Sequence, residues 1–146
     1  MARTPGAGAA GGLGFALLAF LGARLTPGIE LVAREIDLDG ALAGADLVLT
    51  GEGSVDAQTL SGKAPAGVAA AARARGVPVV LFAGRVAPDA DALLAAGVEA
   101  IVCITPEGQP LREALALAGP NLEAATQRHL LERPGGGVGG PVGATR

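Results

Sequence analysis

The sequence contains no tryptophan or tyrosine, and it has one cysteine, Cys103, and one histidine, His129. A single cysteine excludes a disulfide within the chain. One cysteine and one histidine also cannot supply the four ligands of a structural zinc site. These counts fit a reducing compartment, and we expect a cytoplasmic protein.

Charged residues are also scarce. They make up 17% of the 146 residues, and the formal net charge is −3. The 11 basic residues are scattered along the chain rather than gathered in a stripe. Without such a stripe there is little to neutralise a phosphate backbone, so we expect no nucleic-acid partner. No basic amphipathic face points to a membrane surface either. Half of the residues are hydrophobic, which predicts a folded chain of at most one compact domain.

The first 25 residues contain an uncharged run, 4–23, that superficially looks like a signal peptide or a membrane span. Five glycines in its first half argue against both, because a spanning or secretory helix needs large apolar residues there. We favour a glycine-rich loop followed by a buried helix. The apolar residues that share one face at helical spacing are Leu13, Leu17, Phe20, Leu21 and Leu25.

The middle of the chain alternates between short apolar runs and helical patterns. Runs at 46–50, 77–83 and 100–105 are typical of strands covered on both faces. Helices are expected between them at 65–75 and 88–96, each with proline at its start and glycine just past its end. This order predicts an α/β protein with a parallel βαβαβ sheet. Further helices are expected at 27–36, 111–118 and 121–131, and the glycine-rich tail from residue 133 or 134 to 146 is expected to be disordered.

The connection from Thr50 to Pro65 is long and polar, and it follows the first strand. Ligands of open α/β sheets gather beyond the carboxyl ends of strands, so this loop is the main candidate site. Lys63 is the only lysine beside ten arginines, and an ammonium before a helix suits a phosphate or a carboxylate. Glu52 and Asp56 could hold Mg²⁺ or accept a proton. The alternative is a solvated loop whose polar side chains cap turns.

Other features give weaker signals. The spacing Gly6-x-Gly8-x-x-Gly11 formally matches a dinucleotide fingerprint, but no strand precedes it. It still predicts exposed backbone N–H groups that can approach an anion. Arg85, after the second predicted strand, could clamp a carboxylate or lie on the surface. Cys103 is expected in the core, and His129 is expected to be solvated or to cap a helix.

Several ordered blocks together resemble the bacterial glycerate kinases. The blocks are 4–14, 27–30, 50–53 with Asp56, Gln58, Thr59, Gly62, Lys63 and Pro65, then 68–69 and 83–84. The resemblance covers residues 4–131. It implies transfer of the γ-phosphoryl group of ATP to D-glycerate with Mg²⁺. It also implies a Rossmann-like domain formed by both ends of the chain, with a second α/β domain inserted between them.

On this resemblance, residues 1–40 are the end of the inserted domain and 41–132 are the C-terminal part of the Rossmann-like domain. The family's N-terminal blocks are absent, so we expect a C-terminal fragment that lacks the N-terminal half of the enzyme and is inactive alone. The alternatives are a noncatalytic nucleotide or phosphometabolite binding module, and a remnant that does not fold.

The residue roles implied by chemistry and resemblance divide into three groups. Asp56 and Lys63 are the predicted catalytic residues, and Asp56 with Glu52 is the predicted metal pair. The predicted substrate or phosphate contacts are Gly8, Gly11, Gly12, Gly51, Glu52, Gly53, Gln58, Thr59, Ser61 and Gly62.

Overall fold

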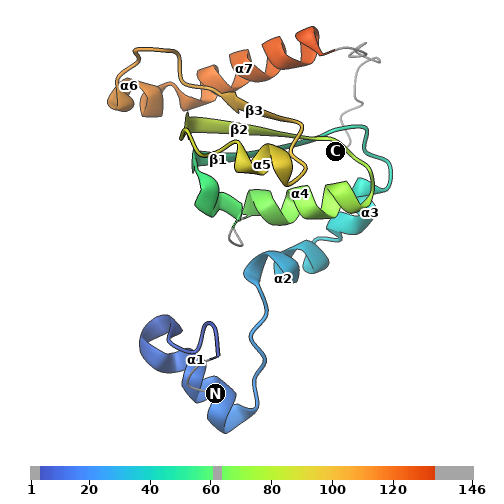
Figure 1. The fold of residues 1–146 in the computed structure, drawn as a ribbon, viewed down its shortest axis with the longest axis vertical. Helices are drawn as coiled ribbons and strands as arrows, with labels where there is room; N and C mark the ends of the chain where they lie inside the picture. The colour runs from blue at the N-terminus through green and yellow to red at the C-terminus, as the bar shows by residue number, and fades with distance from the viewer. Residues whose placement is uncertain (1–3, 61–63, 134–146) are drawn as a thin grey trace, which may run out of the picture.

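The computed structural model describes residues 4–60 and 64–133, and its centre is a parallel sheet of three strands (Figure 1). The strands are β1 (Val48–Val55), β2 (Val79–Val86) and β3 (Ala100–Cys103), in the order β1-β2-β3. The predicted α/β class and the βαβαβ succession are confirmed. Each strand overlaps one of the predicted apolar runs.

The first two strands are longer than the apolar runs indicated. Their pairing continues past the apolar residues, with Glu52 opposite Ala83 and Val55 opposite Val86. The prediction that the chain leaves the strand at Thr50 is therefore wrong, and Arg85 lies within β2 rather than after it. Parallel pairing satisfies the backbone groups of these polar and glycine residues, so they stay extended without an apolar pattern.

Glycine makes this extension possible where β1 and β2 run closest. A Cβ atom added to Gly84 would lie 2.8 Å from the carbonyl oxygen of Gly53. A side chain at position 84 would therefore push the two strands apart. Gly84 is therefore a requirement of the strand pairing.

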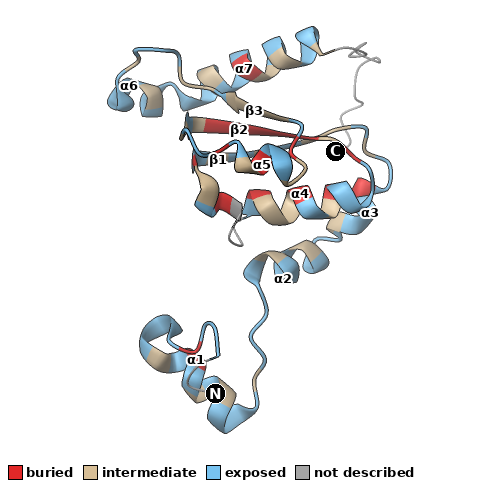
Figure 2. Cartoon of the chain, in the orientation of Figure 1, coloured by how far each residue is buried: buried red, intermediate tan, exposed pale blue. Residues whose placement is uncertain are grey.

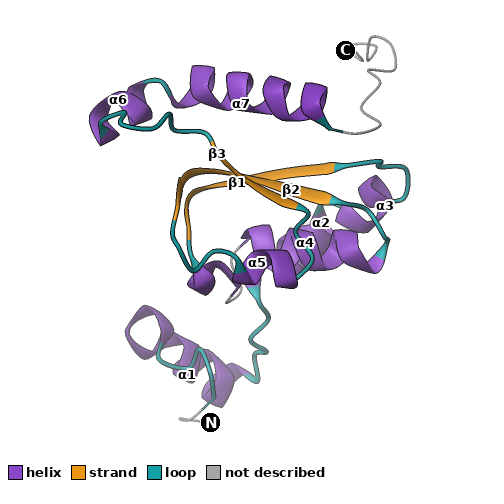
Figure 3. Cartoon of the chain, turned by 45° about the horizontal axis from the view of Figure 1, so that its top comes forward, coloured by secondary structure: helices purple, strands orange, loops and turns teal. Residues whose placement is uncertain are grey.

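Helices cover the sheet on both faces, as Figure 3 shows. On one face lie α4 (Ala64–Ala74) and the short α5 (Ala92–Ala95), and on the other lies α7 (Ala118–Glu132). The larger core lies under α4 and α5 and is built around Val79, Leu81 and Leu93, all fully buried. The core under α7 is smaller, with Val80, Phe82 and Ala125 buried. Figure 2 shows β2 as the most continuously buried strand.

The helix boundaries follow the expected caps with two differences. Gly76 and Gly97 have φ angles of 69° and 105°, so each ends its helix in a conformation that favours glycine. The helix expected at 88–96 forms only α5, because residues 88–91 make turns. The break expected at Gly119-Pro120 lies earlier, between α6 (Leu111–Ala116) and α7. Pro120 fits the first turn of α7, where its missing N–H has no partner to lose.

The N-terminal helix is the main departure from expectation. The helix α1 (Ala9–Leu21) stands apart from the sheet, joined to it through residues 22–27 (Figure 1). Its apolar residues are exposed, with Phe20 at 81% and Leu21 at 75%, so the prediction of a buried helix is wrong. Helical periodicity identifies a common face, and in the described residues no element packs on that face closely enough to bury it.

The next two helices lie against the sheet body. Both α2 (Gly28–Glu35) and α3 (Leu38–Leu42) contact α4. Ile29 packs directly against Gly67, where an added Cβ atom would collide with the isoleucine side chain. The domain boundary at residue 40 stays a prediction. The tail at 134–146 lies outside the described residues.

Among the described residues, no helix combines the length and the apolar character that crossing a membrane requires.

Candidate functional site

The candidate site begins within β1 rather than after it. Gly51, Glu52 and Gly53 are strand residues, and their neighbours on β2 decide which face of the sheet each one occupies. Gly51 is opposite Phe82, which packs in the α7 core, whereas Glu52 is opposite Ala83, which packs in the α4 core. Because strand residues alternate between faces, Gly51 and Gly53 share the α7 face and Glu52 lies on the α4 face.

A reciprocal pair of hydrogen bonds fixes the chain just after β1. The backbone N–H of Thr59 donates to Oδ1 of Asp56 at 3.1 Å, and the backbone N–H of Asp56 donates to Oγ1 of Thr59 at 3.3 Å. This arrangement is a capping box at the start of the 3₁₀ helix η1 (Ala57–Leu60). Thr59 is fully buried, so its hydroxyl is part of the fold. The predicted ligand contacts of Thr59 stay a prediction.

The predicted metal pair, Glu52 and Asp56, stays a prediction. Glu52 is a residue of β1, and Asp56 follows the end of that strand. No group of three metal-ligating side chains occurs in the ranges 4–60 and 64–133.

The remaining predicted contacts fall in three places. Gln58 is exposed on η1, next to the capping box. Gly11 and Gly12 belong to α1 and Gly8 is its N-cap, and this helix stands apart from the sheet, so the structure does not bring them to β1. Ser61, Gly62 and Lys63 lie outside the described residues.

The glycine-rich segment does have an unusual backbone. Ala10, Gly11 and Gly12 have φ angles of 51°, 67° and 97°, which interrupt the first turns of α1. Such a run requires glycine at most positions, and Ala10 adopts it at a steric cost. The loop expected before the helix is therefore present in the form of this left-handed stretch.

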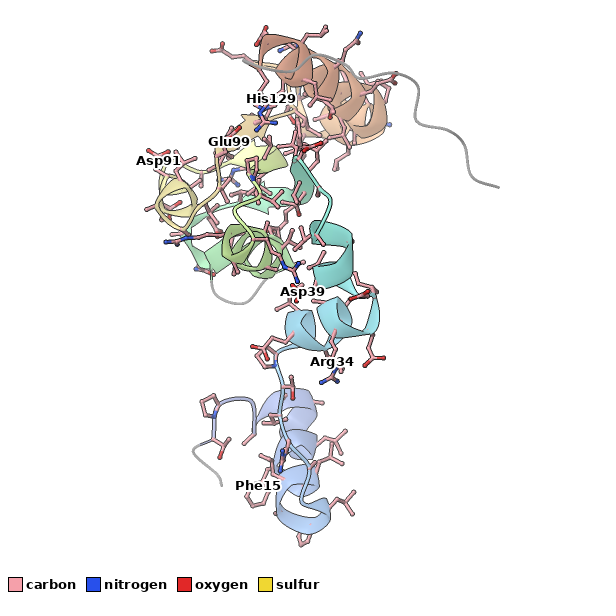
Figure 4. The ribbon with its side chains drawn as sticks, turned by 90° about the vertical axis from the view of Figure 1, so that its right-hand side faces the viewer. Phe15, Arg34, Asp39, Asp91, Glu99 and His129 are labelled. Carbon is pink, nitrogen blue, oxygen red and sulfur yellow. The ribbon has the colours of Figure 1, made fainter. Side chains whose placement is uncertain are left out.

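Three residues outside the loop differ from expectation. Cys103 is exposed at the end of β3 rather than buried, because the strand stops there. Arg85 is a strand residue and is exposed, which agrees with the alternative that it lies on the surface. His129 is neither solvated nor a cap. Its ring stacks edge-on against Phe82, with 6.1 Å between centroids, and Figure 4 places it between α7 and the sheet.

One contact at this edge of the sheet was not found from the sequence. The Thr105 hydroxyl donates to the carbonyl oxygen of Gly84 at 2.6 Å, and it ties the segment after β3 to the end of β2. A threonine just past an apolar run gives no signal that separates such a tie from ordinary solvent exposure.

Comparison with known proteins identifies the family. The family model described as the glycerate kinase family matches residues 1–131. The chain belongs to the glycerate kinase family. The glycerate kinase of Bacillus subtilis (strain 168) is 45% identical over 120 residues, which are 82% of this chain and 31% of that protein. The glycerate 2-kinase of Escherichia coli (strain K12) is 41% identical over 123 residues, covering 84% and 32%.

A solved structure supports the same conclusion. The structure described as glycerate kinase 2 from Salmonella typhimurium LT2 has a TM-score of 0.60 and 42% identity, covering 87% of this chain and 33% of that one. The chain thus spans about a third of the length of these relatives. The predicted resemblance is confirmed for a glycerate kinase family member that matches the C-terminal part of each relative.

Proposed function

We propose that this chain supplies the β1-to-α4 part of a glycerate kinase active site, where ATP phosphorylates D-glycerate. Family membership over residues 1–131 is the observation that carries this proposal. The E. coli relative is named a glycerate 2-kinase, which favours the 2-hydroxyl as the acceptor. The activity belongs to the complete protein, because the chain spans about a third of its relatives.

The geometry favours a site at the carboxyl end of β1. Open α/β sheets bind ligands at this edge. Here β1 ends at Val55, the capping box fixes Asp56, and α4 begins at Ala64. The first N–H groups of an α-helix have no intrahelical partners and favour anions. A phosphate or a carboxylate is thus the ligand that suits this edge.

Asp56 is proposed to accept the proton of the attacking hydroxyl. Its Oδ1 atom accepts the Thr59 N–H, which fixes the carboxylate and leaves Oδ2 for the substrate. As the glycerate oxygen bonds to the γ-phosphorus, the bond from that phosphorus to the bridging oxygen breaks and ADP leaves. The proton of the hydroxyl goes to Asp56. Lys63, placed here from the sequence alone, would neutralise phosphate charge, which is the main catalytic requirement of such transfers.

Gly53 supports close approach of a ligand to the strand. It has no positive φ, and a Cβ added to it would meet nothing within 4 Å. Neither backbone conformation nor packing within the described residues therefore requires glycine there. Backbone that must lie close to a ligand is another reason for glycine.

The test is a chimera in which residues 4–131 replace the matching part of the B. subtilis relative. Formation of phosphoglycerate from ATP, Mg²⁺ and D-glycerate is followed by ³¹P NMR. Asp56→Asn and Lys63→Ala should each lower kcat at least 100-fold, as expected for groups acting on the reacting atoms. The control is Asp46→Asn, an exposed aspartate before the opposite end of β1. Equal rates for Asp56→Asn and Asp46→Asn would remove Asp56 from the mechanism.

Binding without transfer is the second candidate for the chain by itself. The length of the chain favours it, because the chain spans about a third of the length of its relatives. Incubating the chain alone with ATP, Mg²⁺ and D-glycerate distinguishes the two. Nucleotide binding without phosphoglycerate would assign the chain a binding role only.

A further inference from the structure

The sheet face under α7 contains a cavity of about 570 Å³ next to the candidate site. Its floor is formed by β1 and β2, and one wall is formed by α7. The residues that line it are Leu49, Thr50, Gly51, Glu52, Phe82, Ile104, Leu122 and Thr126. Its volume falls within the range of about 300–1,000 Å³ typical of small-molecule sites.

The shape of the cavity follows from the alternation along β1. Leu49, Gly51 and Gly53 share the α7 face. The two glycines carry no side chain into the space above the strand. A Cβ on Gly51 would meet only the Phe82 carbonyl oxygen within 4 Å, at 3.1 Å. The floor therefore carries no side chain at Gly51.

The lining of the cavity is mainly apolar. Leu49, Phe82, Ile104 and Leu122 give it apolar surfaces, and Glu52 is its one charged member among the described residues. A second carboxylate, such as D-glycerate, would bury little apolar area there. A flat aromatic ring, by contrast, buries apolar area against Phe82 and Leu122.

One wall also offers hydrogen bonding. Leu122 and Thr126 lie four residues apart on α7 and so share a helix face. In the described part of the chain, the Thr126 hydroxyl has no hydrogen-bond partner. A hydroxyl can donate to or accept from the nitrogens at the edge of a heteroaromatic ring.

We propose that this cavity binds the purine base of the nucleotide, with the ring between Phe82 and Leu122 and its edge toward Thr126. This inference rests on the proposed kinase function and adds the position of the base. Gly51 lines the cavity, and β1 leads from it to Asp56, which follows the end of the strand. With the base over Gly51, the phosphates would lie toward Asp56.

The position of His129 fits the same arrangement. Its ring lies one turn beyond Thr126 on α7 and contacts the edge of Phe82. This contact, together with the burial of Phe82, restricts the orientation of the Phe82 ring that lines the cavity.

The experiment uses the 146-residue chain and a ribose-labelled fluorescent ATP, displaced in turn by adenosine, guanosine and tripolyphosphate. Adenosine should displace the probe, and tripolyphosphate should require a higher concentration. Leu122→Trp fills the cavity and should raise the Kd of the probe at least tenfold, equivalent to about 1.4 kcal/mol. The matched control is Leu130→Trp on the same helix, because Leu130 is 37% exposed, close to the 43% of Leu122, and does not line the cavity. It should change Kd less than twofold.

Each other outcome overturns the inference. Equal Kd values for the two tryptophan variants would place the base elsewhere, and displacement by tripolyphosphate but not by adenosine would limit binding to phosphate. No binding of the probe by the chain would indicate that another polypeptide segment covers the cavity. If Leu122→Trp does not fold by circular dichroism, Thr126→Leu narrows the same wall and carries the same expectation. Phosphoglycerate formation by the chimera decides the kinase proposal separately, since it does not depend on where the base binds.

Discussion

The contact between Gly53 and Gly84 offers a sharp test of how β1 and β2 pair. In Gly84→Ala the new methyl group would lie 2.8 Å from the Gly53 carbonyl oxygen, whereas ordinary contact begins at 3.4 Å. The neighbour is backbone in a paired strand, so it cannot rotate away. Overpacking of this kind costs about 1–3 kcal/mol.

Part of this cost is offset in the unfolded chain. Replacing glycine by alanine reduces unfolded-state entropy, which stabilises by about 0.4–1 kcal/mol where the native backbone accepts alanine. We expect Gly84→Ala to lower the free energy of unfolding by about 1–2 kcal/mol. Gly53→Ala is the matched control, because its methyl group meets nothing within 4 Å and its φ is not positive. The control should be neutral or slightly stabilised.

Urea denaturation followed by far-UV circular dichroism measures both variants, since the chain has no tryptophan or tyrosine to report by fluorescence. The midpoint should fall for Gly84→Ala with an unchanged m-value. Equal midpoints for the two variants would refute the close approach of the strands at this point. In the chimera, Gly53→Ala should raise KM for a substrate without loss of stability, which separates its proposed role from that of Gly84.

Two further predictions concern contacts that hold elements in place. Thr59→Val should lower the free energy of unfolding by about 1–2 kcal/mol, because it removes the hydroxyl that accepts the Asp56 N–H inside the fold. Thr59→Ser, which keeps the hydroxyl, should recover most of this in the same denaturation assay, and no difference between the two would contradict a capping role. Arg133→Ala removes a two-bond contact with Glu99, at 3.1 and 3.3 Å, which ties the end of α7 to the start of β3. The pair is partly exposed, so the loss should be at most about 1 kcal/mol and should shrink in high salt; a larger, salt-independent loss would contradict this account.

The three strands and their parallel βαβαβ succession could be predicted from the sequence because each strand contains a short, unbroken apolar run. Leu81 and Val80 are buried on opposite faces of β2, and this double burial is the signal that an unbroken apolar run carries. Proline and glycine placed the ends of α4 correctly to within one or two residues. These signals are local, so one sequence is enough to find them.

The extents of β1 and β2 could not be predicted, because they depend on a partner distant in the sequence. Residues 51–55 form a strand because β2 runs beside them, and nothing in their own composition favours extension. For helix α1, the helix itself could be predicted, but its burial could not. Its apolar face is plain from the spacing, but burial depends on an element that packs against it, and Phe20 remains exposed.

The longer strand changes what the candidate site can do. Read as a loop, residues 51–63 could fold Glu52 and Asp56 around one ligand, and a shared metal followed naturally. In the structure, Gly51, Glu52 and Gly53 belong to β1, whereas Asp56 follows the strand and begins the capping box. The polar segment is therefore divided between a strand and the connection after it rather than forming one loop. An elongated ligand with an apolar end and an anionic end fits that layout, and a nucleoside triphosphate has this form.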